Sequence, residues 1–119
     1  MHEFSIAESI VRVSEEVLRA NGGGRAEKIY LRIGELRQVV PDALTFAFDI
    51  LKQDTLLAEA SLEWEMVPAR VRCKSCGTEY HPGDVFWECP SCGALGAEVV
   101  AGEELEIVSL TVLGGSDGD

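Results

Sequence analysis

The chain has 119 residues, with 21 acidic and 10 basic side chains and a formal net charge of −11. This length fits one small domain, or one small domain with an added module. The charge argues against a nucleic acid partner, because affinity for phosphates comes from clustered lysine and arginine. No apolar run approaches the length of a membrane span. We therefore expect a cytoplasmic protein that binds neither membranes nor nucleic acid.

The first predicted element is a helix over residues 4–20, because apolar residues recur there at helical spacing. Its start is open by one turn. Ser5 and Glu8 have the spacing of a capping box, whereas Glu3 suits the first turn of a helix that begins earlier. The run 21–24, Asn-Gly-Gly-Gly, predicts the end of the helix, since glycine supplies the left-handed residue of a C-cap.

The rest of the chain predicts three strands and a second helix. Alternating apolar and polar residues favour strands over 28–34 and 62–66, and the second of these ends before Pro68. Between them, Pro41 predicts the first position of a helix. A third strand over 105–112 is expected to return to the first two. The predicted fold is α+β: a small three-stranded mixed sheet with two helices on one face, plus an inserted zinc-ribbon-like module that carries four cysteines.

Two Cys-x-x-Cys pairs, separated by twelve residues, predict a metal site in this module. The four residues are Cys73, Cys76, Cys89 and Cys92. Two thiolates three residues apart on a tight turn can face one ion, and a second such turn completes a tetrahedral zinc site. The glycine after each pair can take a positive φ, which lets the chain curl back around the sulfurs.

Three other interpretations use the same cysteines. Two disulfides would suit a secreted protein, but the sequence shows no signal peptide and paired Cys-x-x-Cys in a cytosolic chain is more often metal-binding. A thioredoxin-like pair would need an adjacent βαβ unit, whereas these pairs lie among turn residues. Iron in a rubredoxin-like site accepts the same four thiolates as zinc. His81, beside Pro82, is either a solvated turn residue or an exchangeable or outer ligand of the zinc.

The N-terminus, Met1-His2-Glu3, offers a second candidate metal site. The α-amine of Met1, the backbone nitrogen of His2 and its Nδ1 can close adjacent five- and six-membered chelate rings around one ion. Three nitrogens in a plane suit Ni(II) or Cu(II), whereas Zn(II) prefers tetrahedral donors. The alternative is that His2 is simply the second residue of an exposed terminus.

With both stretches in view, the chain resembles the HypA/HybF family of hydrogenase nickel-incorporation proteins. The resemblance rests on Met1-His2-Glu3, on residues 33–36 and 41–48 (Ile-Gly-Glu-Leu and Pro-Asp-Ala-Leu-Thr-Phe-Ala-Phe), on the paired cysteines, and on Glu104-Leu105 before the last strand. It implies a nickel metallochaperone that delivers Ni(II) to the large subunit of [NiFe]-hydrogenase with a HypB-type GTPase, and in some organisms also serves urease maturation.

The resemblance also implies roles for individual residues. Met1 and His2 correspond to the nickel chelate, and Glu3 to a residue that orients this site or contacts a partner. Asp42 corresponds to a position associated with nickel, and the four cysteines to ligands of a structural zinc. The implied domains are a nickel-binding α/β domain of residues 1–67 and 103–114 and a zinc-binding domain of residues 68–102, with a disordered tail over 115–119.

Two further classes of function use the same residues differently. A zinc-ribbon adaptor that binds proteins, with no role for nickel, needs only the cysteines and agrees with the acidic charge. An enzyme has little support, because a site of four cysteines leaves no open metal position for water and no catalytic Ser/His/Asp set or phosphate loop is present. We therefore predict a metallochaperone that is not an enzyme.

Overall fold

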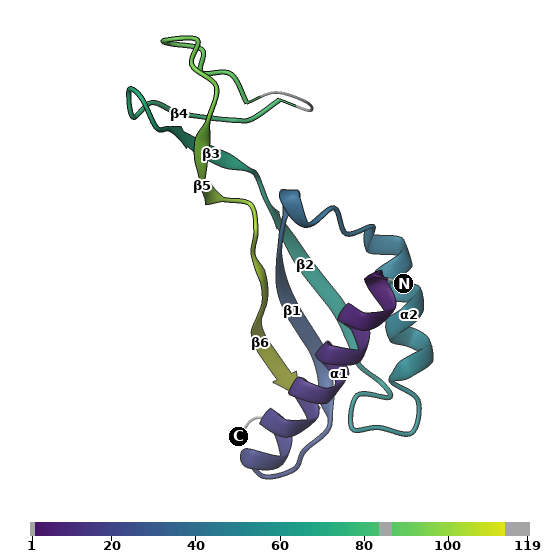
Figure 1. The fold of residues 1–119 in the computed structure, drawn as a ribbon. Coiled ribbons are helices and arrows are strands. Elements are labelled where there is room, and N and C mark those ends of the chain that lie inside the picture. Colours follow the sequence, from purple (N-terminus) through teal and green to yellow (C-terminus); the bar gives the residue numbers. More distant parts are fainter. Residues whose placement is uncertain (1, 84–86, 114–119) are drawn as a thin grey trace. The chain divides into compact units, whose positions relative to one another are not determined.

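The computed structural model describes residues 2–83 and 87–113, in two helices, one short 3-10 helix and six strands (Figure 1). In chain order these are α1 (His2–Ala20), β1 (Ala26–Gly34), η1 (Glu35–Arg37), α2 (Pro41–Leu51), β2 (Ser61–Val67), β3 (Arg70–Cys73), β4 (Glu79–Tyr80), β5 (Ala97–Ala101) and β6 (Leu105–Val112). None of the described helices combines the length and the apolar character that a membrane span requires. The predicted tail over 115–119 lies outside the described residues.

The chain forms two compact units. The helical unit contains the described residues of 1–31, 39–65 and 106–119, and the cysteine unit contains those of 32–38 and 66–105. Residues 32–38 therefore belong with the cysteines, although they follow the rest of β1 directly in the sequence.

Helix α1 has the earlier of the two predicted starts, with Glu3 in its first turn. It ends where the glycines predicted, because the carbonyl of Leu18 accepts hydrogen bonds from Asn21 N (3.1 Å) and Gly23 N (2.7 Å). Gly22 and Gly23 both have positive φ, which residues with a side chain rarely adopt. The buried stripe consists of Ile6, Ala7, Ile10, Val11, Ser14 and Leu18.

The first sheet has the strand order β2-β1-β6. Contacts from β1 to β2 advance in the same direction, since Lys28 pairs with Glu63 at 3.3 Å and the Tyr30 hydroxyl donates to Glu65 at 3.2 Å. Strand β6 runs the opposite way, because Gly34 N donates to the carbonyl of Glu104 at one end and Leu113 N to that of Arg25 at the other. The sheet is therefore mixed, and the predicted fold class is confirmed.

The core of the helical unit is made of large apolar side chains. The large apolar side chains of this unit that are at most 1% exposed come from β1, α2 and the loop after α2: Ile29, Leu31, Leu44, Phe48 and Leu57. Helix α2 begins at Pro41, as predicted, and α1 and α2 lie beside each other (Figure 1). Burial of this kind stabilises by about 1.5 to 3 kcal/mol for each such side chain.

The cysteine unit contains a second three-stranded sheet, with the order β4-β3-β5, that the sequence did not predict. Both neighbours run antiparallel to β3. Val71 is opposite Tyr80 and Val99, whereas Arg72 is opposite Glu79 and Glu98. Because side chains alternate across a strand, one face of the sheet is apolar and the other is charged.

Residues 34–37 are bound closely to the rest of the cysteine unit. Leu36 N donates to the carbonyl of Gly102 at 2.8 Å, and Arg37 Nε donates to that of Glu103 at 2.8 Å. The approach at Gly34 is so close that an added Cβ would lie 2.1 Å from the Gly102 oxygen. Glycine is required at position 34 because no side chain fits there.

Candidate metal centres

The structure brings the four predicted cysteines together. Cys73 Sγ lies 3.7 Å from Cys92 Sγ, and Cys76 Sγ lies 3.5 Å from Cys89 Sγ. All four sulfurs lie within 4.8 Å of one another, and none forms a disulfide. A tetrahedron with metal–sulfur bonds of about 2.3 Å has edges of about 3.8 Å, close to these separations. The cluster therefore has the dimensions of a zinc site.

Both Cys-x-x-Cys pairs have the same local geometry. Ser75 N donates to Cys73 Sγ and Ser91 N donates to Cys89 Sγ, each at 3.4 Å. The glycine after each pair donates to the carbonyl of the first cysteine, at 3.0 Å in the first turn and 2.8 Å in the second, and both glycines have positive φ. The turns form for the reason predicted: glycine allows the chain to fold back and direct N–H groups at the sulfurs.

Electrostatics in the cluster favour a cation. The pKa of Cys76 is lowered to about 6, chiefly by the side chain and backbone of Thr78. At Cys92 the backbone N–H of Ala94 acts to lower the pKa. The other three thiols and burial act in the opposite direction and outweigh it, so the pKa is raised to about 11. Four thiolates this close repel one another, so they cannot all be charged without a metal. A divalent cation held by the four sulfurs removes that repulsion.

One member of each pair is buried and the other is exposed, with Cys73 and Cys89 each 2% exposed. These two pack with Val71 and Tyr80, and the partly buried Trp87 lies against the same cluster. A four-sulfur site leaves no position for water or substrate, so a metal here would have a structural role.

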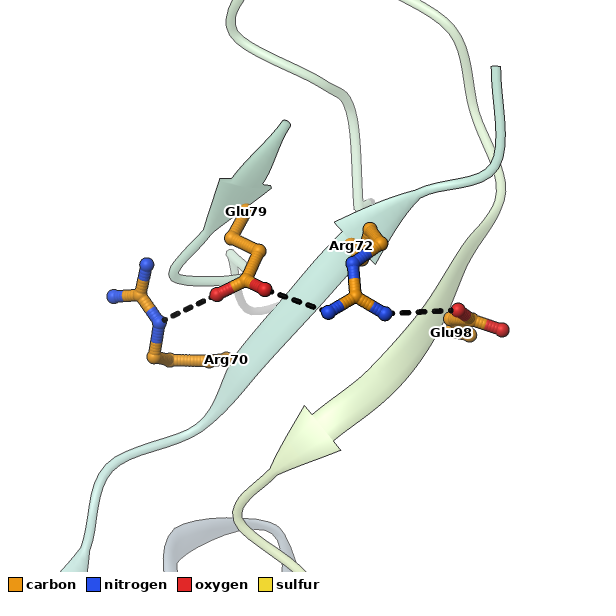
Figure 2. Close-up of polar contacts among 4 residues, drawn as sticks. All are labelled: Arg70, Arg72, Glu79 and Glu98. Atoms are coloured by element: carbon orange, nitrogen blue, oxygen red, sulfur yellow. Dashed lines mark hydrogen bonds and ion pairs between the residues drawn. The ribbon is translucent and has the colours of Figure 1, made fainter. Parts of the chain in front are cut away.

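The opposite face of the β4-β3-β5 sheet carries a row of four alternating charges (Figure 2). Glu79 lies between two arginines, 3.5 Å from Arg70 Nε and 2.7 Å from Arg72 Nη2. Arg72 Nη1 continues the row to Glu98 at 3.2 Å. The Arg72 guanidinium lowers the pKa of Glu79, and Glu79 in turn raises that of Arg72. The row links all three strands across the face that lacks the cysteines.

At the N-terminus the structure describes His2 and Glu3 but not Met1. His2 is exposed and is the first residue of α1. The first four N–H groups of a helix have no acceptor within it, so the His2 amide is not used by helical hydrogen bonding. Glu3 Oε2 accepts a hydrogen bond of 3.0 Å from Val40 N, the residue before α2. This bond is the main cause of the lowered pKa of the Glu3 carboxyl.

Known proteins resemble this chain over nearly its whole length. The family described as "Hydrogenase/urease nickel incorporation, metallochaperone, hypA" matches residues 1–112. The chain belongs to the HypA family. A relative named "Hydrogenase maturation factor HypA" from Geobacter metallireducens is 46% identical over 112 residues, which cover 94% of this chain and 99% of that protein. One of the same name from Roseiflexus sp. is 43% identical, covering 92% and 90%.

Two solved structures share the fold. The solution structure of the Ni metallochaperone HypA from Helicobacter pylori has a TM-score of 0.69 at 24% identity, covering 95% of this chain and 98% of that one. A second solution structure of a HypA protein has a TM-score of 0.72 at the same identity, covering 97% and 98%. HypA proteins are metallochaperones in nickel incorporation and not enzymes, as predicted. The four-cysteine cluster fits the structural zinc predicted beside the nickel.

The sequence did not predict the contact that His81 makes in this HypA family member. His81 Nε2 lies 3.0 Å from Glu35 Oε1, and the same carboxylate accepts a hydrogen bond of 2.7 Å from Ala69 N. These two contacts lower the pKa of Glu35, the Ala69 bond more strongly. Among the described residues, the candidate metal ligands that lie close together are the four cysteines. His81 does not belong to this group. No signal near Glu35 or His81 links them, because 46 residues separate them.

Proposed function

We propose that the protein binds Ni(II) at its N-terminus and delivers it to the large subunit of [NiFe]-hydrogenase, acting with a HypB-type GTPase. The observation that carries this proposal is the place of His2: an exposed side chain on the first residue of α1, whose backbone nitrogen has no helical acceptor. The family description, nickel incorporation for hydrogenase and urease, supports the choice of cargo. Urease maturation proteins are the second candidate partners.

The proposed chelate consists of the Met1 amine, the His2 amide nitrogen and His2 Nδ1. Ni(II) favours in-plane nitrogen donors and can displace the amide proton. An exposed terminal site with an incomplete protein ligand set suits transfer, because an incoming ligand from a partner can bind before the chelate releases the ion.

Glu3 has a separate role in this proposal. Its carboxylate accepts the hydrogen bond from Val40 N, so it is held beside the start of α2. We infer that Glu3 orients the N-terminal chelate from this position. Asp42, exposed in the first turn of α2 and two residues after Val40, belongs to the same end of the helical unit.

The second metal has the opposite role. Zn2+ would be held permanently by Cys73, Cys76, Cys89 and Cys92. The bound ion would stabilise the fold of a zinc-binding domain that we assign to residues 68–102. Nickel would bind in the domain formed by residues 1–67 and 103–114. Paired cysteines that hold a metal instead of forming disulfides are typical of a reducing compartment, and we therefore place the protein in the cytoplasm.

The test is a nickel titration of untagged protein that keeps Met1, with metal analysis and the absorption spectrum. We expect one nickel with a planar d–d band and one zinc per chain. His2→Ala should lose the nickel and keep the zinc. His81→Ala is the matched control, because it removes the other histidine and should keep both metals.

Two results would overturn the proposal. Nickel that binds only by displacing zinc from the cysteines would place the cargo in the wrong site. Nickel bound equally by wild type and His2→Ala would remove the N-terminal chelate. In either case the protein is better explained as a zinc-ribbon adaptor without a nickel role. Separately, if the metal analysis finds iron instead of zinc, iron is the metal held by the cysteines.

A further inference from the structure

The two Cys-x-x-Cys pairs share one backbone geometry but differ in a single nearby side chain. In the first pair, Cys73 N donates to the carbonyl of Thr78 at 2.9 Å. In the second pair, Cys89 N donates to the carbonyl of Ala94 at 3.0 Å. Positions 78 and 94 are therefore equivalent in the two turns. The first carries a hydroxyl, whereas the second carries only a methyl group.

The Thr78 hydroxyl lies beside the sulfur of the exposed cysteine of its own pair. Thr78 Oγ1 is 3.2 Å from Cys76 Sγ and 3.3 Å from the hydroxyl of Ser91, which belongs to the other pair. A hydroxyl hydrogen rotates to suit its partners, and a thiolate can only accept a hydrogen bond. When Cys76 is a metal ligand, Thr78 therefore donates to its sulfur and accepts from Ser91.

Cys92, the exposed cysteine of the second pair, has no such neighbour. Among residues 2–83 and 87–113, no side-chain hydroxyl bonds to the Cys92 sulfur, which lies 3.7 Å from Cys73 Sγ. Ala94 supplies only its backbone N–H. The two exposed sulfurs thus differ by one hydrogen bond to a charged acceptor, and such bonds are roughly twice as strong as those between neutral groups.

We propose that Thr78 is a positioning residue of the cysteine cluster whose hydroxyl protects Cys76, so that Cys92 is the sulfur that a soft electrophile attacks first. A hydrogen bond withdraws electron density from a thiolate and makes it less nucleophilic. In the attack by an alkyl halide, the Cys92 sulfur forms a bond to carbon and the halide ion leaves. The product is a neutral thioether, which holds a cation more weakly than a thiolate does.

This order of reactivity gives the closed site one defined point of opening. Cys73 and Cys89 are each 2% exposed, so a reagent from solvent reaches the other two sulfurs first. Between Cys76 and Cys92, the hydroxyl of Thr78 makes the difference. The zinc site would have this order of reactivity whether or not nickel binds at the N-terminus.

The experiment treats the zinc-loaded full chain with a limiting amount of iodoacetamide and locates the label by peptide mass spectrometry. We expect Cys92 to be alkylated about tenfold faster than Cys76, which is the rate equivalent of one hydrogen bond to a charged acceptor. Thr78→Val keeps the shape of the side chain without the hydroxyl and should speed alkylation of Cys76 by about tenfold. Thr78→Ser keeps the hydroxyl and is the matched control, which should react as the wild type does.

Two further measurements separate the hydrogen bond from a merely structural role. Ala94→Ser places a hydroxyl at the equivalent position and should slow alkylation of Cys92. With Co(II) in place of zinc, the sulfur-to-metal charge-transfer band of Thr78→Val should move to longer wavelength, because a sulfur without the bond gives up an electron more easily. The proposal is overturned if Cys76 and Cys92 react equally in the wild type, if Thr78→Val leaves the rate or the band unchanged, if Thr78→Ser behaves as Thr78→Val does, or if Ala94→Ser does not slow Cys92.

Discussion

The two units of this protein are stabilised in different ways. The helical unit has a core of large apolar side chains from α1, α2 and the first sheet, including Leu44 and Phe48 at 0% exposure. In the cysteine unit, the cluster of Val71, Tyr80, Cys73 and Cys89 is buried around the metal site, and two of these four side chains are candidate metal ligands. A few buried residues cannot stabilise a sheet of short strands alone. Hydrophobic burial therefore maintains one unit, whereas the other depends on its metal.

The same contrast separates the two candidate metal sites. The four sulfurs surround a closed site within the cysteine unit, where a bound metal has no free position for an incoming ligand. His2 is exposed at the start of α1, where an ion can be approached from solvent. One site is suited to retain its metal and the other permits exchange.

Loss of the metal should have the largest effect, and it should act on the cysteine unit alone. We expect Cys89→Ser to lose the zinc and to unfold β3, β4 and β5, because the buried ligand is also a core residue. Amide hydrogen exchange should show lost protection in these strands and retained protection in α1 and α2. Ser91→Ala, which changes a neighbour that supplies no metal ligand side chain, should keep the zinc. Equal loss of protection in both units would mean that they fold together.

A cavity in the helical unit tests the opposite case. Phe48→Ala should lower the free energy of unfolding of this unit by about 3 to 5 kcal/mol, since the ring is fully buried. Zinc content should not change. Phe46→Ala, two residues away on the exposed face, is the control and should alter stability by no more than about 0.5 kcal/mol. Urea denaturation, monitored by the far-UV circular dichroism of the helices, measures the stability of both variants.

The smallest effect concerns the Glu3 bond to Val40 N. Because folding lowers the pKa of this carboxyl from 4.5, its charge stabilises the helical unit above that pH, and the contribution is lost as the pH falls through the lowered value. Glu3→Gln should therefore be less stable than wild type near neutral pH, and the difference should shrink below pH 4.5. Denaturation curves of nickel-free protein across this range measure it, with Glu8→Gln as the control for loss of one charge. A difference independent of pH would contradict this role of the charge.

The sequence predicted those features that leave a local pattern. The helical spacing of apolar residues in α1, the alternation of Ile29, Leu31 and Ile33 in β1, and the spacing of the cysteines each lie within one short stretch, and the structure contains this helix, this strand and this sulfur cluster. Val17, which the helical spacing placed on the apolar side of α1, is nevertheless 43% exposed. Zinc-ribbon strands were missed because β3 has four residues and β4 two, too few to show a period.

Contacts between distant segments could not be predicted in this way. Glu35 forms hydrogen bonds with Ala69 and His81 because the fold brings three separate segments of the chain together. Met66 continues the alternation of apolar residues in β2 but is 45% exposed. Whether a strand residue is buried depends on which segment packs over it, and the periodicity of the strand carries no information about that.

The close fit of residues 34–37 to the cysteine unit matters for anyone who wishes to study zinc binding on a synthetic peptide. A peptide of residues 68–102 would contain all four cysteines but not Glu35 or Leu36, which bond Ala69 N and the Gly102 carbonyl. Both of its ends would then lack their partners and fray. A second short peptide carrying residues 32–38, supplied separately, is the missing piece from which such a minimal zinc module could be reassembled.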